Sequence, residues 1–199
     1  MALATYSDVV SAVGDWLERG DLETRIPTFI ALTEAKLNRR LQDPEQEVTS
    51  TATAVGDYTA LPEDFGEMVS VTTGEGPLQA MGPAEYASTL DTWVGTPRFY
   101  SIFDGGIALY PRNSTAAFTL VYRRTIPPLT EDNPTNWLLT RAPDVYLYGA
   151  LVEASAWDVD GDKLPQWNTL FEAAVTSLMA DGVRRRWGAG AIAPRIRRT

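Results

Sequence analysis

Acidic side chains between residues 57 and 67 are the first group in this sequence that could do chemistry. Asp57, Glu63, Asp64 and Glu67 lie close together along the chain. Hydrolysis of a glycosidic bond needs two carboxyl groups, one on each side of the bond. Nothing in the sequence places these four across a cleft, and clustered acids in a turn are usually solvated. Glycosidic hydrolysis is therefore an alternative that an assay on polysaccharides would test.

A second acidic run, Asp158-Val-Asp-Gly-Asp162, is similar to a calcium-binding loop. In such a loop the glycine is the sixth residue and a glutamate is the last ligand. Here Gly161 is the fourth residue, and Thr169 stands in place of the glutamate. The pattern favours a solvated turn between two helices, in which Gly161 gives the backbone its freedom.

The sequence contains no cysteine and no histidine. Thiol nucleophiles, Cys/His metal sites, Ser-His-Asp triads and disulfides are therefore excluded. The absence of these two residue types removes much of enzyme chemistry. The first residues lack a basic segment followed by an apolar run, and no run of about eighteen apolar residues occurs. We therefore expect a soluble protein, made in the cytoplasm, with no membrane contact.

Arginines dominate the C-terminal end of the chain. Guanidinium groups bind carboxylates or phosphates through paired hydrogen bonds, so these arginines and the neighbouring Trp187 are candidate binding residues. The rest of the chain holds 11 of the 17 basic residues and all 26 acids, a formal charge of −15 that repels nucleic acid. A sequence-reading DNA-binding protein is disfavoured, and the alternative role of the arginines is a solvated end that touches DNA transiently. The arginines are Arg184, Arg185, Arg186, Arg195, Arg197 and Arg198.

Tryptophans are spread over the whole sequence, and their large rings predict buried core positions. Trp93, beside Gly95-Thr-Pro97, and Trp187, after the last predicted helix, are the exceptions. We expect these two to contact a neighbouring subunit, with local packing as the alternative. The full set is Trp16, Trp93, Trp137, Trp157, Trp167 and Trp187.

Two helices are predicted at the beginning of the chain, as the first of the elements that must position the candidate residues. Apolar residues at helical spacing predict a first helix capped by Ser7 and running to about Arg19, with Gly20 as its stop. A second helix is predicted from Pro27 until Asp43. Together they form a helical hairpin over residues 1–43.

In residues 48–129 the apolar side chains recur with a period closer to two, as in β-strands. This pattern predicts an inserted antiparallel β-sandwich or small barrel. Asp104-Gly105-Gly106 is a strong hairpin turn between two of the strands. A short helix is expected from Pro83 to Leu90. The predicted strands cover residues 49–55, 68–72, 99–103, 107–110 and 117–122.

Residues 130–187 return to helical spacing after a proline-rich crossing. One helix is predicted from Pro143 to Trp157 and a last one from Pro165 past Met179. These helices would complete a bundle with the N-terminal hairpin, while residues 188–199 form an extended tail that orders only against a partner. The predicted fold class is thus α+β: a helical bundle from both ends of the chain, with a β module inserted.

Four segments resemble the head–tail adaptor family of tailed bacteriophages. The longest runs from Asp132 to Ala154 and reads DNPTNWLLTRAPDVYLYGALVEA. The others are Arg25 to Arg39 (RIPTFIALTEAKLNR), Leu61-Pro-Glu-Asp-Phe65 and Gly95-Thr-Pro-Arg-Phe-Tyr100. The resemblance extends from Thr5 to about Trp187.

The resemblance implies a structural protein that is not an enzyme, with no catalytic residue, no metal and no cofactor. Such proteins form a ring, commonly of about twelve copies, that binds below the portal and carries the tail, nozzle or stopper protein. Double-stranded DNA passes through the channel without sequence-specific binding, which an acidic lumen favours. The C-terminal segment, with Trp187 and the six arginines, would dock on the portal. The protein would lie in the neck of the virion after assembly in the host cytoplasm.

Two other functions are compatible with the residues. A free carbohydrate- or ligand-binding β module with helical flanks would account for the strands and for exposed aromatic rings. A tail or neck completion protein, one layer further from the head, would also form a ring. Sugar affinity without virion association would identify the first, and the contacts made in the virion would identify the second.

Overall fold

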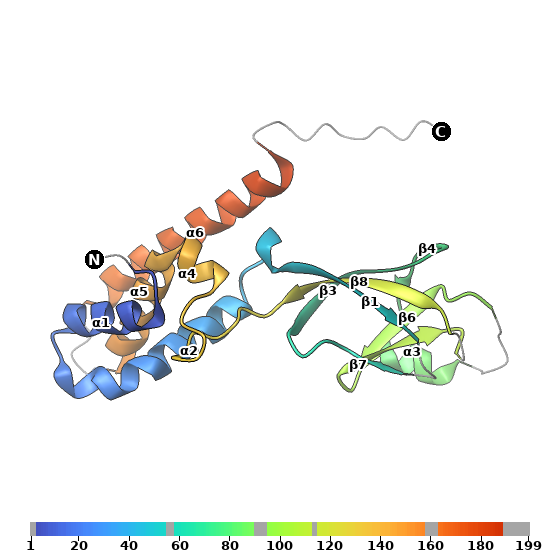
Figure 1. Cartoon of the computed structure of the whole chain (residues 1–199), viewed down its shortest axis with the longest axis horizontal. Helices are drawn as coiled ribbons and strands as arrows, with labels where there is room; N and C mark the ends of the chain where they lie inside the picture. The colour runs from blue at the N-terminus through green and yellow to red at the C-terminus, as the bar shows by residue number, and fades with distance from the viewer. Residues whose placement is uncertain (1–2, 55–57, 90–94, 113–114, 158–162, 189–199) are drawn as a thin grey trace. The chain divides into compact units, whose positions relative to one another are not determined.

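A computed structural model of the chain describes residues 3–54, 58–89, 95–112, 115–157 and 163–188. The fold is mixed α+β (Figure 1). It divides into two compact units, one made of Met1–Glu45 with Ile126–Thr199 and the other of Gln46–Thr125. No described helix has both the length and the apolar character that crossing a membrane requires.

The first unit is helical, and its central element is α5. This helix packs against α1, α2 and α6 and has buried residues on all sides, as expected for a helix enclosed by others. The elements of this unit are α1 (Tyr6–Leu17), η1 (Gly20–Arg25), α2 (Ile26–Asn38), α4 (Trp137–Arg141), α5 (Pro143–Trp157) and α6 (Leu164–Trp187), with η2 (Pro44–Gln46) at the unit boundary.

The beginning of α1 differs from the prediction, because Thr5 rather than Ser7 is the N-cap. The Asp8 backbone N–H donates to Thr5 Oγ1 at 3.3 Å, and the Thr5 backbone N–H donates to Asp8 Oδ2 at 2.9 Å. This reciprocal pair satisfies two free donors at once, which Ser7 cannot do from its position. The Thr5 hydroxyl also lowers the pKa of Asp8. The helix ends at Leu17, and its C-cap Glu18 has a left-handed φ of 53°, before the predicted stop at Gly20.

A buried polar network fixes the segment that returns from the second unit. Glu34, only 6% exposed, accepts hydrogen bonds at Oε1 from the Leu129 backbone N–H and the Tyr146 hydroxyl, each at 2.9 Å. The Asn136 amide donates to the Tyr146 hydroxyl and to the Pro127 carbonyl, each at 2.7 Å. The bonds to Leu129 and Pro127 satisfy backbone groups of a proline-containing segment, which cannot form the regular hydrogen bonds of a helix or a sheet.

The second unit contains two four-stranded sheets, with strand orders β1-β8-β3-β4 and β2-β7-β6-β5. Neither order closes into a barrel among the described residues, and the β5–β6 pairing is parallel rather than antiparallel. The predicted hairpin turn is confirmed, with Asp104 and Gly105 both at positive φ between β6 and β7. The elements are β1 (Glu47–Thr53), β2 (Thr59–Ala60), β3 (Phe65–Thr73), β4 (Gly76–Pro77), β5 (Gln79–Ala80), α3 (Pro83–Ser88), β6 (Phe99–Phe103), β7 (Gly106–Tyr110) and β8 (Ala117–Arg124).

Each unit has its own hydrophobic core. In the β unit, Val71, Ile107, Phe118 and Leu120 are almost completely buried. In the helical unit, the core joins α1, α2, α5 and α6 and includes Ile126 and Leu129, so the chain enters this core before residue 130. The C-terminal helix α6 is therefore packed into the helical core through its buried side chains.

Candidate functional site

The C-terminal part of α6 is the most accessible helical surface that carries predicted binding residues. Phe171, Val175 and Leu178 in the first part of the helix are buried in the helical core. From Val183 to Trp187 every side chain is exposed. The helix therefore leaves the core, and its last turns are exposed to solvent.

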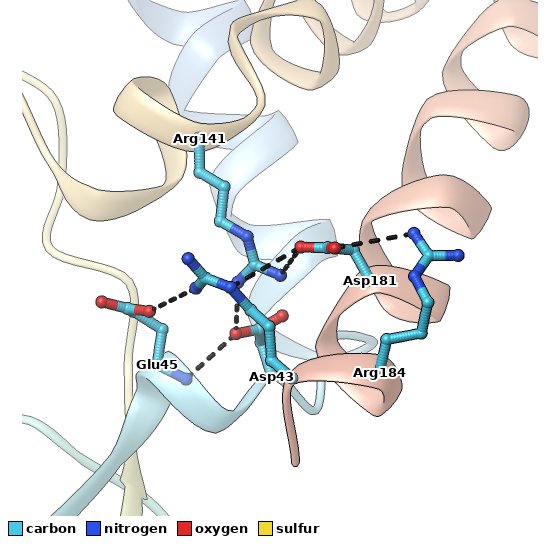
Figure 2. Close-up of polar contacts among 6 residues, drawn as sticks. Asp43, Glu45, Arg141, Asp181 and Arg184 are labelled. Atoms are coloured by element: carbon cyan, nitrogen blue, oxygen red, sulfur yellow. Dashed lines mark hydrogen bonds and ion pairs between the residues drawn. The ribbon is translucent and has the colours of Figure 1, made fainter. Parts of the chain in front are cut away.

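An ion-pair network fixes these last turns (Figure 2). Arg141, at the end of α4, bonds Asp43 Oδ1 through Nη1 at 2.7 Å and Asp181 Oδ2 through Nη2 at 2.6 Å. The Asp43 side chain is 2% exposed and that of Arg141 is 14% exposed. A charge buried this deeply requires its partner, so Arg141 connects α6 to the segment after α2.

Two of the predicted arginines extend this network outward. Arg184 Nη2 lies 3.5 Å from Asp181 Oδ1, and Arg185 Nη1 lies 3.0 Å from Glu45 Oε2. Their side chains are 63% and 53% exposed. Exposed pairs of this kind orient the guanidinium groups and contribute little stability, so the arginines remain accessible to a partner's carboxylates.

Gly182 allows α6 to approach the segment after α2. A Cβ at this position would lie 2.6 Å from Asp43 Oδ2 and 3.3 Å from Pro44 Cδ. Any larger residue would push the helix away from Asp43. The close approach therefore depends on the glycine as well as on the ion pairs.

The ion-pair network also shifts the pKa values of two of its members, Asp181 and Arg141. The hydrogen bond from Arg141 lowers the pKa of Asp181, which keeps this carboxyl charged. Burial alone would lower the pKa of Arg141, but its hydrogen bonds to Asp43 and Asp181 outweigh burial and raise it. Arg141 and Asp181 thus both stay ionised over the ordinary pH range.

An apolar stripe runs beside the arginines on the same helix. Met179, Val183 and Trp187 are spaced four residues apart, so they share one face, and they are 41%, 61% and 56% exposed. The four-residue spacing that continues to Trp187 is the signal that identifies this face. We call Met179, Val183 and Trp187 the α6 stripe.

The arrangement is suited to binding another protein. An aromatic or aliphatic anchor flanked by arginines is the usual composition of an interface hot spot. Arg186 is also exposed on the last turn of α6. A partner that fits this surface has an apolar groove bordered by carboxylates.

Several predicted site residues lie outside the described residues. These are Trp93, Asp57, the acidic run 158–162, and the terminal arginines Arg195, Arg197 and Arg198. Among the residues that are described, no cluster of three or more Asp, Glu, His or Cys side chains is arranged to hold a metal ion.

The described acids of the first candidate group lie in the β unit. Asp64 accepts a hydrogen bond from the Tyr122 hydroxyl at 2.8 Å, and Glu67 forms an ion pair with Arg123. Glu63 is exposed. The contacts of Asp64 and Glu67 are those of structural side chains at the beginning of β3.

The prediction of buried tryptophans is right for Trp167, which is 7% exposed, and wrong for two others. Trp16 is 44% exposed because only part of its ring packs against Trp167 and Tyr148. Trp157 is 58% exposed and lies under the guanidinium of Arg25, 4.6 Å from the ring centroid. Ring contacts in the case of Trp16, and the Arg25 guanidinium in the case of Trp157, stabilise these rings without burying them.

Comparison with known proteins gives one family. The model of the family described as SU10 adaptor protein matches residues 4–197. Among curated proteins, no significant match to the chain is found. The family match spans both units and includes the whole of α6.

Proposed function

Because the chain belongs to the SU10 adaptor protein family, a family of phage head–tail adaptors, we propose that it forms the adaptor ring between portal and tail. The family confirms the resemblance found in the sequence and makes the protein a structural component of the virion that contacts other virion proteins. In the proposed role, copies assemble below the portal, extend the DNA channel and carry the tail, nozzle or stopper protein. The protein acts by assembly and not by turnover.

The observation that carries this proposal is the exposed end of α6. A ring subunit needs a surface that is rigid in its own fold and accessible to the portal. The Arg141 network supplies the rigidity, and the α6 stripe with Arg184, Arg185 and Arg186 supplies the accessible surface. Arg195, Arg197 and Arg198 continue the same basic segment in the sequence.

The charge of the remaining chain supports passage of DNA. Residues before Arg184 carry all 26 acidic side chains and 11 basic ones. A channel surface of this composition lacks the phosphate contacts that dominate non-specific DNA binding, so packaged DNA slides along it. Such a ring forms through heterologous contacts that close by rotation, and about twelve copies fit the proposed symmetry.

The first experiment is to purify virions of the source phage and measure the copy number of this protein relative to the portal protein by quantitative mass spectrometry. We expect a ratio near one, since both rings would have the same cyclic symmetry. Absence of the protein from virions would refute the adaptor role and favour the free binding module. A ratio far from one would favour a completion protein in another layer.

A second experiment tests the docking surface directly. Val183→Ser with Trp187→Ser should reduce co-purification with the portal protein by about tenfold or more, because hot-spot side chains carry most of an interface's affinity. Leu32→Ser, at another exposed apolar position on α2, is the matched control. Equal recovery of the two variants with the portal would show that the α6 stripe is not the docking surface.

A further inference from the structure

A groove of about 600 Å³ lies between α1 and the segment that leads into α2. Its floor is apolar and includes Val10, Gly14 and the completely buried Ile26. Gly14 has no side chain to cover the floor, and an added Cβ would make only an ordinary van der Waals contact with Ile26 Cδ1, at 3.6 Å. One aliphatic side chain of a partner can be buried there.

The rim of this groove is acidic. Among the described residues that line it, Arg19 is the only basic one, and Asp21 binds its guanidinium through hydrogen bonds of 2.8 and 2.9 Å. The charge of Arg19 is thus balanced beside the groove, while the rim carboxylates remain exposed to solvent. A partner segment with positive charges and one apolar side chain matches both the rim and the floor. The rim carboxylates are those of Asp15, Glu18, Glu23 and Glu131.

The chain itself contains a segment of this composition. Its last residues read Arg195-Ile196-Arg197-Arg198-Thr199, with an aliphatic side chain between arginines and no acid after Asp181. Arginine forms paired hydrogen bonds with carboxylates, and isoleucine is an effective apolar anchor. In sequence and charge this segment is complementary to the groove.

The same copy cannot easily supply that segment. Trp167, near the beginning of α6, lies with its ring centroid 5.5 Å from that of Trp16 on α1. From Trp167 to Trp187 the helix rises about 30 Å, which places its end away from α1 within the helical unit (Figure 1). The nine residues from Trp187 to Ile196 span about 30 Å only when fully extended. They would have to run straight back along their own helix merely to reach the level of Trp16.

We infer that the groove between α1 and α2 of one copy binds the segment Arg195-Ile196-Arg197-Arg198 of a second copy. Ile196 lies on the apolar floor, and the arginines pair with the acidic rim. The contact joins two different surfaces, so it is heterologous and can be repeated around a ring. It deepens the proposed ring assembly, on which it rests. It assigns Arg195, Arg197 and Arg198 to the second copy instead of the portal, and leaves the α6 stripe with the arginines of α6 for the portal.

The natural absence of cysteine allows a direct test in the full chain. Ser11→Cys, at an exposed position in the groove, and Thr199→Cys, at the last residue, are made in separate chains, of which one carries a size tag. The two are mixed and treated with a short bismaleimide. We expect about tenfold more cross-linked heterodimer than for a mixture with Ser177→Cys, because several ion pairs and one buried anchor are worth about a factor of ten. Ser177 is an exposed serine on α6 outside the groove.

Charge reversal provides the second readout. Glu18→Arg with Glu23→Arg in the groove copy should remove the enrichment, and Arg197→Glu with Arg198→Glu in the tail copy should restore it. The enrichment should also fall as salt is raised, since exposed charges are screened. Glu85→Arg, at an exposed position on α3 in the other unit, is the charge control and should leave the enrichment unchanged.

Three outcomes would overturn the inference. One is equal cross-linking at positions 11 and 177, and another is the absence of any effect from charge reversal. The third is efficient closure within single dilute chains that carry both Ser11→Cys and Thr199→Cys, which would identify the same copy as the occupant. None of these outcomes depends on virion copy number, so the adaptor role would stand or fall separately.

Discussion

At the scale of single residues, the buried carboxyl of Glu34 makes the stability of the folded protein depend on pH. Burial raises the pKa of Glu34 and outweighs the two hydrogen bonds, from Leu129 and Tyr146, that lower it. The folded state therefore holds this proton to higher pH than the unfolded state. The stabilisation is present below the unfolded pKa and is lost as the pH rises through the folded pKa.

Glu34→Gln should remove this dependence while keeping an acceptor for Leu129 and Tyr146. We expect the free energy of unfolding of the wild type, relative to the variant, to fall as the pH rises above the ordinary pKa of a glutamate, measured by urea denaturation. Glu172→Gln is the opposing control, since the hydrogen bond from Arg40 lowers the pKa of Glu172 and its contribution is lost as pH falls. Parallel stability curves for the wild type and Glu34→Gln would contradict the argument.

Gly149 tests packing at the most crowded point of α5. An added Cβ would lie 2.3 Å from Thr33 Cγ2 and 3.0 Å from Phe171 Cε2. Gly149→Ala should destabilise the protein by about 1–2 kcal/mol, because overpacking exceeds the gain in helix propensity. Gly14→Ala on α1, where the nearest atom is 3.6 Å away, should be neutral or stabilising by up to about 1 kcal/mol. Thermal unfolding that ranks the two variants in the opposite order would refute this account.

At the scale of elements, α6 depends on the ion pairs at its C-terminal part. Arg141→Met should cost about 3 kcal/mol, because it leaves the carboxylate of the buried Asp43 without its Arg141 partner. Arg184→Met, at a 63% exposed position in the same network, should cost less than about 0.5 kcal/mol. Hydrogen exchange should show faster opening of the last turns of α6 in Arg141→Met only. Similar losses in the two variants would mean that burial of Asp43 does not set the strength of the network.

The elements also show which parts of the fold were predictable. The helix Pro143–Trp157 and the hairpin around Asp104-Gly105 follow from strong local signals, and both are confirmed. The strands of two residues, β2, β4 and β5, have too few side chains to show a period, so the sequence missed them. The helix α4 was missed because its five residues merge with the proline-rich crossing before Pro143.

The candidate site was only partly predictable, because some of its contacts join segments that are far apart in the sequence. The arginines were found by composition, which needs no geometry. Asp43 and Asp181, which orient the end of α6, come from segments far apart in the sequence, and only the fold brings them to Arg141. Periodicity alone cannot distinguish the α6 stripe from a buried face, because a helix that leaves the core keeps its apolar spacing.

At the scale of the whole molecule, folding and assembly should depend on different parts of the chain. The buried residues of the helical core end at Leu178, and those of the β unit lie between Ala54 and Tyr122. Residues after Trp187 add none of the described core contacts. We therefore expect the chain to keep both described cores without its last twelve residues.

Truncation after Trp187 should leave the thermal unfolding midpoint within about 2 °C of the wild type, since none of the described core contacts is removed. The same truncation removes Arg195, Arg197 and Arg198, and we expect it to abolish ring assembly on the portal, measured by electron microscopy of the mixed proteins. Replacing only these three arginines by glutamine separates the loss of charge from the loss of length. Normal rings from the truncated chain would show that assembly depends on the folded units alone, whereas a lowered midpoint would show that the last residues belong to the folded structure.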